Sequence, residues 1–198
     1  DEQRRLWREQ QTDQLAEAGY IAIAPDLLSG MAPNGGGSAE LGGPDNVRPY
    51  IQKLPPEQVT ADLQAVVDYV KKLPACNGKV VVAGFCWGGG QSFRFATNNP
   101  DLKAALVFYG TGPEKAEDIA KIKCPVYGFY GGNDARVGAT VPKSEELMKA
   151  AGKTFEPISY EGAGHGFMRT GEEPAGTEPN KAARTAAWKR WLEIMKKV

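Results

Sequence analysis

The stretch GFCWGG at residues 84–89 decides the fold, because it directly follows the apolar run KVVVA at residues 79–83. A buried strand that leads through a glycine-flanked turn into a helix is typical of a nucleophile elbow, which projects its central side chain above a sheet. Glycines allow such a bend because they have no Cβ atom to collide with the backbone. The central residue is Cys86, and since the start of a helix favours negative charge, we expect its thiol to be held partly as a thiolate. The alternative is a structural cysteine buried in a tight turn.

Length and composition restrict the classes of protein and partner. The 198 residues suit a single domain with a sizeable core. Lys+Arg and Asp+Glu both number 24, so the charge balance gives no reason to expect nucleic acid or an anionic membrane as a partner. No apolar run approaches the roughly 20 residues of a membrane-spanning helix.

Residues of the types that commonly bind metals and cofactors are scarce in this sequence. The chain has three widely spaced cysteines and a single histidine, which is neither a disulfide framework nor a metal-ligand set. The glycine runs lack the neighbours that a phosphate-binding fingerprint requires. We therefore predict no metal and no cofactor.

Short apolar runs alternate with helical patterns, which predicts a mostly parallel α/β sheet flanked by helices. The predicted strands cover residues 20–24, 79–83, 103–109, 125–130 and 154–160. The predicted helices cover residues 3–18, 57–73, 87–98, 140–151 and 180–197. Residues 26–56 are rich in glycine and proline and show little periodicity. We predict a long connection there, which either lines a pocket or is a solvated surface excursion.

Two further residues complete a candidate catalytic set with Cys86. His165 is the sole histidine, follows a predicted strand and lies between two glycines, so we predict that it is the general base. Asp134, in the stretch GGND, follows another predicted strand and is the candidate that orients the base; the alternative is an ordinary turn aspartate. The chain order of nucleophile, acid and base is that of the α/β-hydrolases. The backbone N–H of Trp87, the residue after the nucleophile, is the predicted oxyanion donor.

These stretches together resemble the dienelactone hydrolase family, whose members are α/β-hydrolases with a Cys–Asp–His triad. The matching stretches are GFCWGG (84–89), GGND (131–134), GAGHGF (162–167) and AGYIAIAPD (18–26). The similarity runs from about Leu15 onward. It implies that Cys86 is the nucleophile, His165 the base and Asp134 its orienter.

The same resemblance suggests residues that bind substrate. Arg169 matches an arginine that holds the substrate carboxylate in dienelactone-cleaving members, and Arg48 is a candidate for a second one. The alternative for both is a solvated surface charge. The implied function is hydrolysis of small-molecule esters or lactones through a Cys86 acyl-enzyme. A general carboxylesterase or thioesterase is one alternative, and a catalytically silent α/β-hydrolase-like protein is the other.

The N-terminal region departs from the family pattern. Family members place several strands before the helix that leads into Gly19, whereas this chain begins with a charged stretch without a strand pattern. We therefore predict one α/β-hydrolase-like domain over residues 1–198, truncated at its N-terminus and lacking the N-terminal strands. A monomer and a homodimer are both compatible with the sequence. The compartment is open: cytoplasmic, or periplasmic or secreted if a signal peptide was removed upstream.

Overall fold

The computed structural model describes residues 2–198, except for the side chains of residues 2–6, 8 and 44. The chain divides between Cys76 and Asn77 into two compact units. The first unit is helical in its described part, and the second contains the β-sheet.

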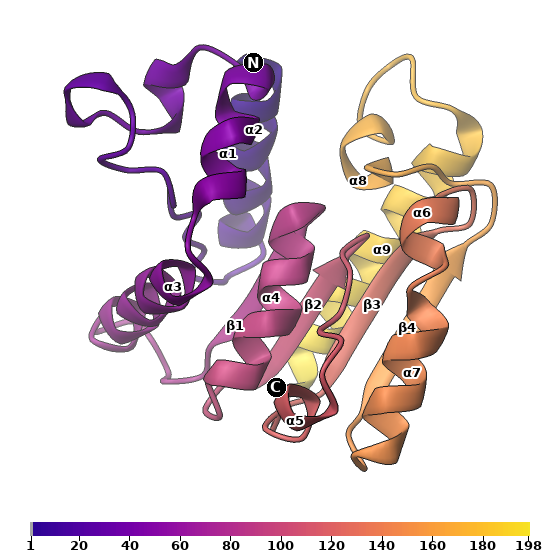
Figure 1. Ribbon diagram of the computed structural model, residues 1–198. Helices are drawn as coiled ribbons and strands as arrows, with labels where there is room; N and C mark the ends of the chain where they lie inside the picture. The colour runs from indigo at the N-terminus through magenta and orange to yellow at the C-terminus, as the bar shows by residue number, and fades with distance from the viewer. Residues whose placement is uncertain (1) are drawn as a thin grey trace. The chain divides into compact units, whose positions relative to one another are not determined.

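Four parallel strands form the sheet of the second unit (Figure 1). They are β1 (Val81–Phe85), β2 (Ala104–Phe108), β3 (Val126–Gly131) and β4 (Phe155–Tyr160), paired in that order. β2 is buried along its whole length, as expected for an inner strand of a sheet covered on both faces. The predicted parallel sheet flanked by helices is confirmed. Because all four strands run in one direction, the residues that follow them lie at one edge of the sheet.

Helices cover both faces of this sheet. They are α4 (Trp87–Asn98), α5 (Ala116–Ile119), α6 (Ala135–Gly138), α7 (Val141–Ala150), α8 (Phe167–Thr170) and α9 (Glu178–Lys197). On one face, Phe93 of α4 contacts Phe155 with ring centroids 5.4 Å apart. On the other, Trp191 of α9 lies 5.0 Å from Phe108, which stacks on Phe129 at 4.2 Å. Such aromatic contacts bury large apolar areas and fix α9 against the sheet (Figure 1).

The connection from β1 to α4 is unusually close. A Cβ atom on Gly84 would lie 2.0 Å from the carbonyl oxygen of Gly88 and 2.5 Å from Oγ of Ser92. A Cβ atom on Gly89 would lie 2.7 Å from the carbonyl oxygen of Phe108. These two glycines therefore provide the space in which α4 approaches β1 and β2. The left-handed backbone conformation at the turn belongs to Cys86 itself, with φ 54°.

The first unit contains three α-helices and two short 3-10 helices among its described residues. They are α1 (Glu2–Glu17), η1 (Pro33–Gly35), η2 (Ser38–Leu41), α2 (Pro44–Lys53) and α3 (Pro56–Lys71). Leu28, Ala32, Leu41, Leu54 and Val59 form a small hydrophobic core of their own. No helix in the described part of the chain combines the length and the apolar composition needed to cross a membrane.

Two predictions for the first unit were wrong. Residues 20–24 form no strand, and the side chains of Ile21 and Ile23 are 44% and 41% exposed. A strand exists only when its backbone groups pair with a neighbour, and no described residue pairs with this segment. Residues 26–56 are not one irregular connection, because they include α2. That helix begins with a proline, which suits a first helical position, and it contains a second proline, Pro49, which is unusual inside a helix.

Gly84→Ala is expected to lower the free energy of unfolding by about 3 kcal/mol or more, because the new methyl group meets main-chain atoms that cannot move aside. Gly88→Ala is the matched control, since a Cβ atom there has no neighbour within 4 Å and alanine favours helix. Urea unfolding followed by circular dichroism measures both variants. Equal losses of stability would contradict the close approach of α4 to β1.

Candidate active site

Cys86 occupies the turn between β1 and α4. It is the N-cap residue of α4, with φ 54° and ψ −120°, and its side chain is exposed. This conformation is strained for any residue other than glycine, and strain of this kind persists only where the surroundings enforce it. Here the backbone N–H of Cys86 donates to the carbonyl oxygen of Phe108 at 3.0 Å. The sulfur is therefore presented at the carboxyl edge of the sheet and at the start of a helix.

Asp134 lies at the same edge, after β3. Its Oδ1 accepts a hydrogen bond from the backbone N–H of Val137 at 3.3 Å, which caps the short helix α6. The side chain is almost fully buried. The neighbouring Asn133 donates from its backbone N–H to Ala163 at 2.9 Å and from its side chain to Gly162 at 3.2 Å. The loop that carries the carboxylate is thus tied to the loop that carries His165.

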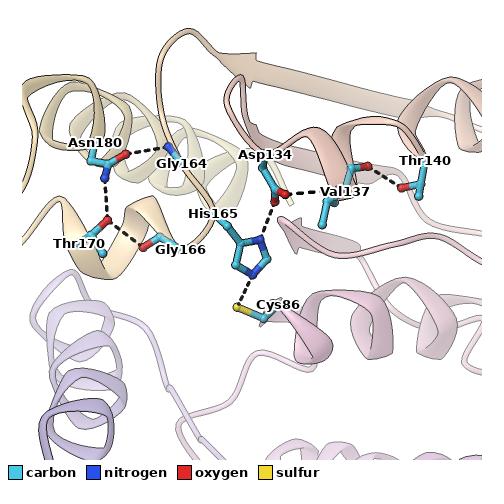
Figure 2. A network of polar contacts seen from close by, with 9 residues as sticks. All are labelled: Cys86, Asp134, Val137, Thr140, Gly164, His165, Gly166, Thr170 and Asn180. Carbon is cyan, nitrogen blue, oxygen red and sulfur yellow. Dashed lines mark hydrogen bonds and ion pairs between the residues drawn. The ribbon is translucent and has the colours of Figure 1, made fainter.

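His165 bridges the other two side chains (Figure 2). Its Nδ1 lies 2.5 Å from Oδ2 of Asp134, and its Nε2 lies 3.1 Å from Sγ of Cys86. The carboxylate can only accept, so Nδ1 carries the hydrogen of the first contact and Nε2 faces the sulfur. Three residues that are far apart in sequence are therefore brought into hydrogen-bonding range at the edge of the sheet where β1, β3 and β4 end.

The pKa of His165 is raised from the usual 6.5 to about 9. The largest cause is the hydrogen bond with Cys86, and the Asp134 carboxylate raises the pKa further. Partial burial opposes the shift, because it disfavours the charged imidazole. The site therefore favours a protonated imidazole between the sulfur and the carboxylate.

Tyr109 is a component that we did not predict. It follows β2 directly, has the left-handed φ of 41° and is almost fully buried. Its ring meets the His165 imidazole edge-on with centroids 5.1 Å apart, and it meets Phe167 at 5.3 Å. Burial raises the pKa of its hydroxyl well above the ordinary value, so the phenol is neutral. Its place after a strand at the same sheet edge was the available sequence signal.

Three further residues were predicted for the site, namely Trp87, Arg169 and Arg48. Trp87 is the first residue of α4, and its backbone N–H makes no hydrogen bond with any described residue. Arg169 lies on α8, where its guanidinium group pairs with Glu173. Arg48 is an exposed residue of α2 and is described within the first unit alone, so its distance from Cys86 is not determined. Over residues 2–198, no three His, Cys, Asp or Glu side chains gather closely enough to hold a metal ion.

We expect the imidazole of wild-type His165 to titrate with a midpoint of about 9, and Cys86→Ala to lower that midpoint by about one unit or more, since the main cause of the shift is removed. NMR of the imidazole protons measures this directly, because the chain has a single histidine. Cys124→Ala is the control, since Cys124 lies before β3 at the opposite end of the sheet. A wild-type midpoint near 6.5 would contradict the described contacts.

Comparison with known proteins agrees with this geometry. Residues 8–198 match the dienelactone hydrolase family. A Methylorubrum extorquens protein, provisionally named a carboxymethylenebutenolidase, is 35% identical in an alignment of 189 positions that covers 89% of this chain and 62% of that protein. The carboxymethylenebutenolidase of Pseudomonas putida is 32% identical over 163 residues, with 79% of this chain and 66% of that protein covered.

A solved structure provides the same indication. The crystal structure of a Klebsiella pneumoniae protein, provisionally named a dienelactone hydrolase, has a TM-score of 0.65 and 28% identity, and the match covers 75% of this chain and 64% of that one. The chain thus spans about two thirds of the length of these relatives. On the strength of the family match and the sequence identity, the chain belongs to the dienelactone hydrolase family.

Proposed function

We propose that this protein hydrolyses carboxylic esters or lactones of small molecules through an acyl-enzyme on Cys86. The observation that carries the proposal is the 3.1 Å contact between Nε2 of His165 and Sγ of Cys86, with Nδ1 held by Asp134. A nucleophile, a base in hydrogen-bonding reach and a group that orients the base are the parts that acyl transfer needs. The carboxymethylenebutenolidase names of relatives support the same class of reaction.

The reaction begins with attack of the Cys86 sulfur on the ester carbonyl, with the thiol proton on His165. The tetrahedral intermediate collapses, the bond from carbon to the alcohol oxygen breaks, and His165 gives its proton to that oxygen. The product left on the enzyme is a thioester. The now neutral imidazole takes a proton from water, the hydroxide attacks the thioester, and the carbon–sulfur bond breaks to release the acid. Asp134 keeps Nδ1 occupied, so that Nε2 faces the reacting atoms throughout.

The negative oxygen of the tetrahedral intermediate requires hydrogen-bond donors. The backbone N–H of Trp87 is unpaired among the described residues and begins α4, where the helix dipole also favours negative charge. We assign it as one donor, and such a donor contributes about 3–4 kcal/mol to the transition state. The mechanism therefore uses the same helix end for the sulfur and for the oxyanion.

The substrate class depends on Arg169. We assign this residue to a carboxylate on the substrate, because it lies four positions after His165 on α8 and its guanidinium already binds a carboxylate, that of Glu173. A substrate carboxylate takes the place of Glu173 in this scheme. Arg48 is proposed as a second contact. The Arg169–Glu173 pair also favours the alternative of a general esterase or thioesterase, since the pair neutralises the arginine.

Rates on a dienelactone and on a neutral p-nitrophenyl ester separate these proposals. His165→Ala is expected to lower kcat on both substrates by about 10³-fold, since proton transfer is lost. Arg169→Met is expected to raise KM about tenfold for the dienelactone alone, because a charge-assisted hydrogen bond to the carboxylate is lost. Arg136→Met, which removes an exposed positive charge from α6, is the control.

Each contrary outcome has a defined meaning. Equal effects of Arg169→Met on both substrates would refute carboxylate recognition by this residue and favour the general esterase. Wild-type protein without activity on either ester would refute the hydrolase and favour a catalytically silent member of the family.

A further inference from the structure

The loop that carries His165 has little intrinsic rigidity. Glycines precede and follow the histidine, and Gly166 has the left-handed φ of 78°. Glycine has the largest backbone freedom in the unfolded and locally unfolded states. Asp134 holds one ring nitrogen, Tyr109 packs against the ring, and Asn133 binds the backbone at Gly162 and Ala163. None of these contacts holds the two glycines directly next to the histidine. Contacts to the backbone on both sides of His165 are therefore needed to keep Nε2 on the sulfur.

One side chain reaches both sides of this loop (Figure 2). Oδ1 of Asn180 accepts a hydrogen bond from the backbone N–H of Gly164 at 2.9 Å. Its Nδ2 donates to Oγ1 of Thr170 at 2.9 Å, and the Thr170 hydroxyl donates to the carbonyl oxygen of Gly166 at 3.3 Å. The side-chain amide has an acceptor and a donor in a fixed geometry, so it satisfies the two partners at once.

The group that makes these contacts is well anchored. Asn180 belongs to the first turn of α9, the long helix that Trp191 fixes to the sheet through Phe108. The helix also lies against α8 without space for another atom, because a Cβ on Gly171 would lie 2.4 Å from the carbonyl oxygen of Asn180. The side-chain amide is therefore a fixed point on the scaffold, against which the histidine loop is set.

We propose that Asn180, acting through Thr170 and the two glycines, is the positioning residue that holds His165 between Cys86 and Asp134. The effect on turnover rests on the proposed hydrolase function, whereas the effect on the position of the imidazole does not. A misplacement of about 1 Å at a reacting group costs on the order of 10²-fold in rate. Loss of the Asn180 side-chain amide is therefore expected to affect kcat more than KM, since Asn180 itself makes no proposed contact with substrate.

Four variants test this inference. Asn180→Ala removes both hydrogen bonds of the side-chain amide, and Thr170→Ser keeps the Thr170 hydroxyl. Thr170→Val removes the hydroxyl contact with Gly166, while the backbone N–H groups of Arg169 and Thr170 still donate to the same carbonyl oxygen. Thr185→Val is the matched control, because the exposed Thr185 hydroxyl also donates to the carbonyl oxygen four residues earlier, on α9. We expect kcat to fall about 10- to 100-fold in Asn180→Ala and by less in Thr170→Val, with KM unchanged. Thr170→Ser and Thr185→Val should retain wild-type kcat.

Two measurements report the position of the His165 loop independently of catalytic activity. In Asn180→Ala and Thr170→Val, the NMR titration midpoint of His165 should move from about 9 towards the ordinary 6.5, as the ring leaves its partners. Amide hydrogen exchange at Gly164 should accelerate in Asn180→Ala, which shows that the hydrogen bond is lost. Faster exchange with unchanged kcat and unchanged titration would overturn the proposal.

The remaining outcomes are also decisive. If Asn180→Ala does not fold, the Thr170→Val and Thr170→Ser pair carries the test, and equal titration midpoints in these two variants would overturn the proposal. If wild-type protein hydrolyses no ester, the proposed function fails, while the titration and exchange measurements still decide whether Asn180 positions His165.

Discussion

The close approach of α4 to β1 and β2 is the constraint on which the site depends. Gly84 and Gly89 leave no room for side chains between these elements, and the backbone N–H of Cys86 is bound to the carbonyl oxygen of Phe108. Cys86 must therefore accept a left-handed conformation, whose local strain the sheet and the helix outweigh. The result is a sulfur presented at the helix start, in reach of a residue from another loop.

The polar part of the site behaves as one electrostatic unit. The imidazole lies between a sulfur and a buried carboxylate, and both favour its charged form, which explains the raised pKa of His165. The position of the ring in turn depends on neutral groups around it. Tyr109 packs against one side of the imidazole, and hydrogen bonds from Asn133 and Asn180 fix the loop on which it sits. The charges that raise the pKa and the contacts that position the ring are therefore supplied by different side chains.

The sequence predicted what local patterns determine. Apolar runs and glycine turns identified the strands of the second unit, and the residues after three of them identified Cys86, Asp134 and His165. Residues 20–24 were mispredicted because strand formation depends on a partner elsewhere in the chain, which the local alternation of side chains does not reveal. The contributions of Tyr109 and Asn180 were missed for a related reason, since each acts through contacts across the fold. The pairing of Arg169 with Glu173 was missed because α8 ends at Thr170, so the two residues meet across the turn after the helix and not along a helix face.

The most direct test of the central claim is rapid-quench mass spectrometry of the wild-type protein during turnover of p-nitrophenyl acetate. The account predicts one acetyl group per chain, on the peptide that contains Cys86, formed as fast as the first equivalent of p-nitrophenol is released. Ester hydrolysis without any acyl group on Cys86, or with the acyl group on another residue, would contradict it.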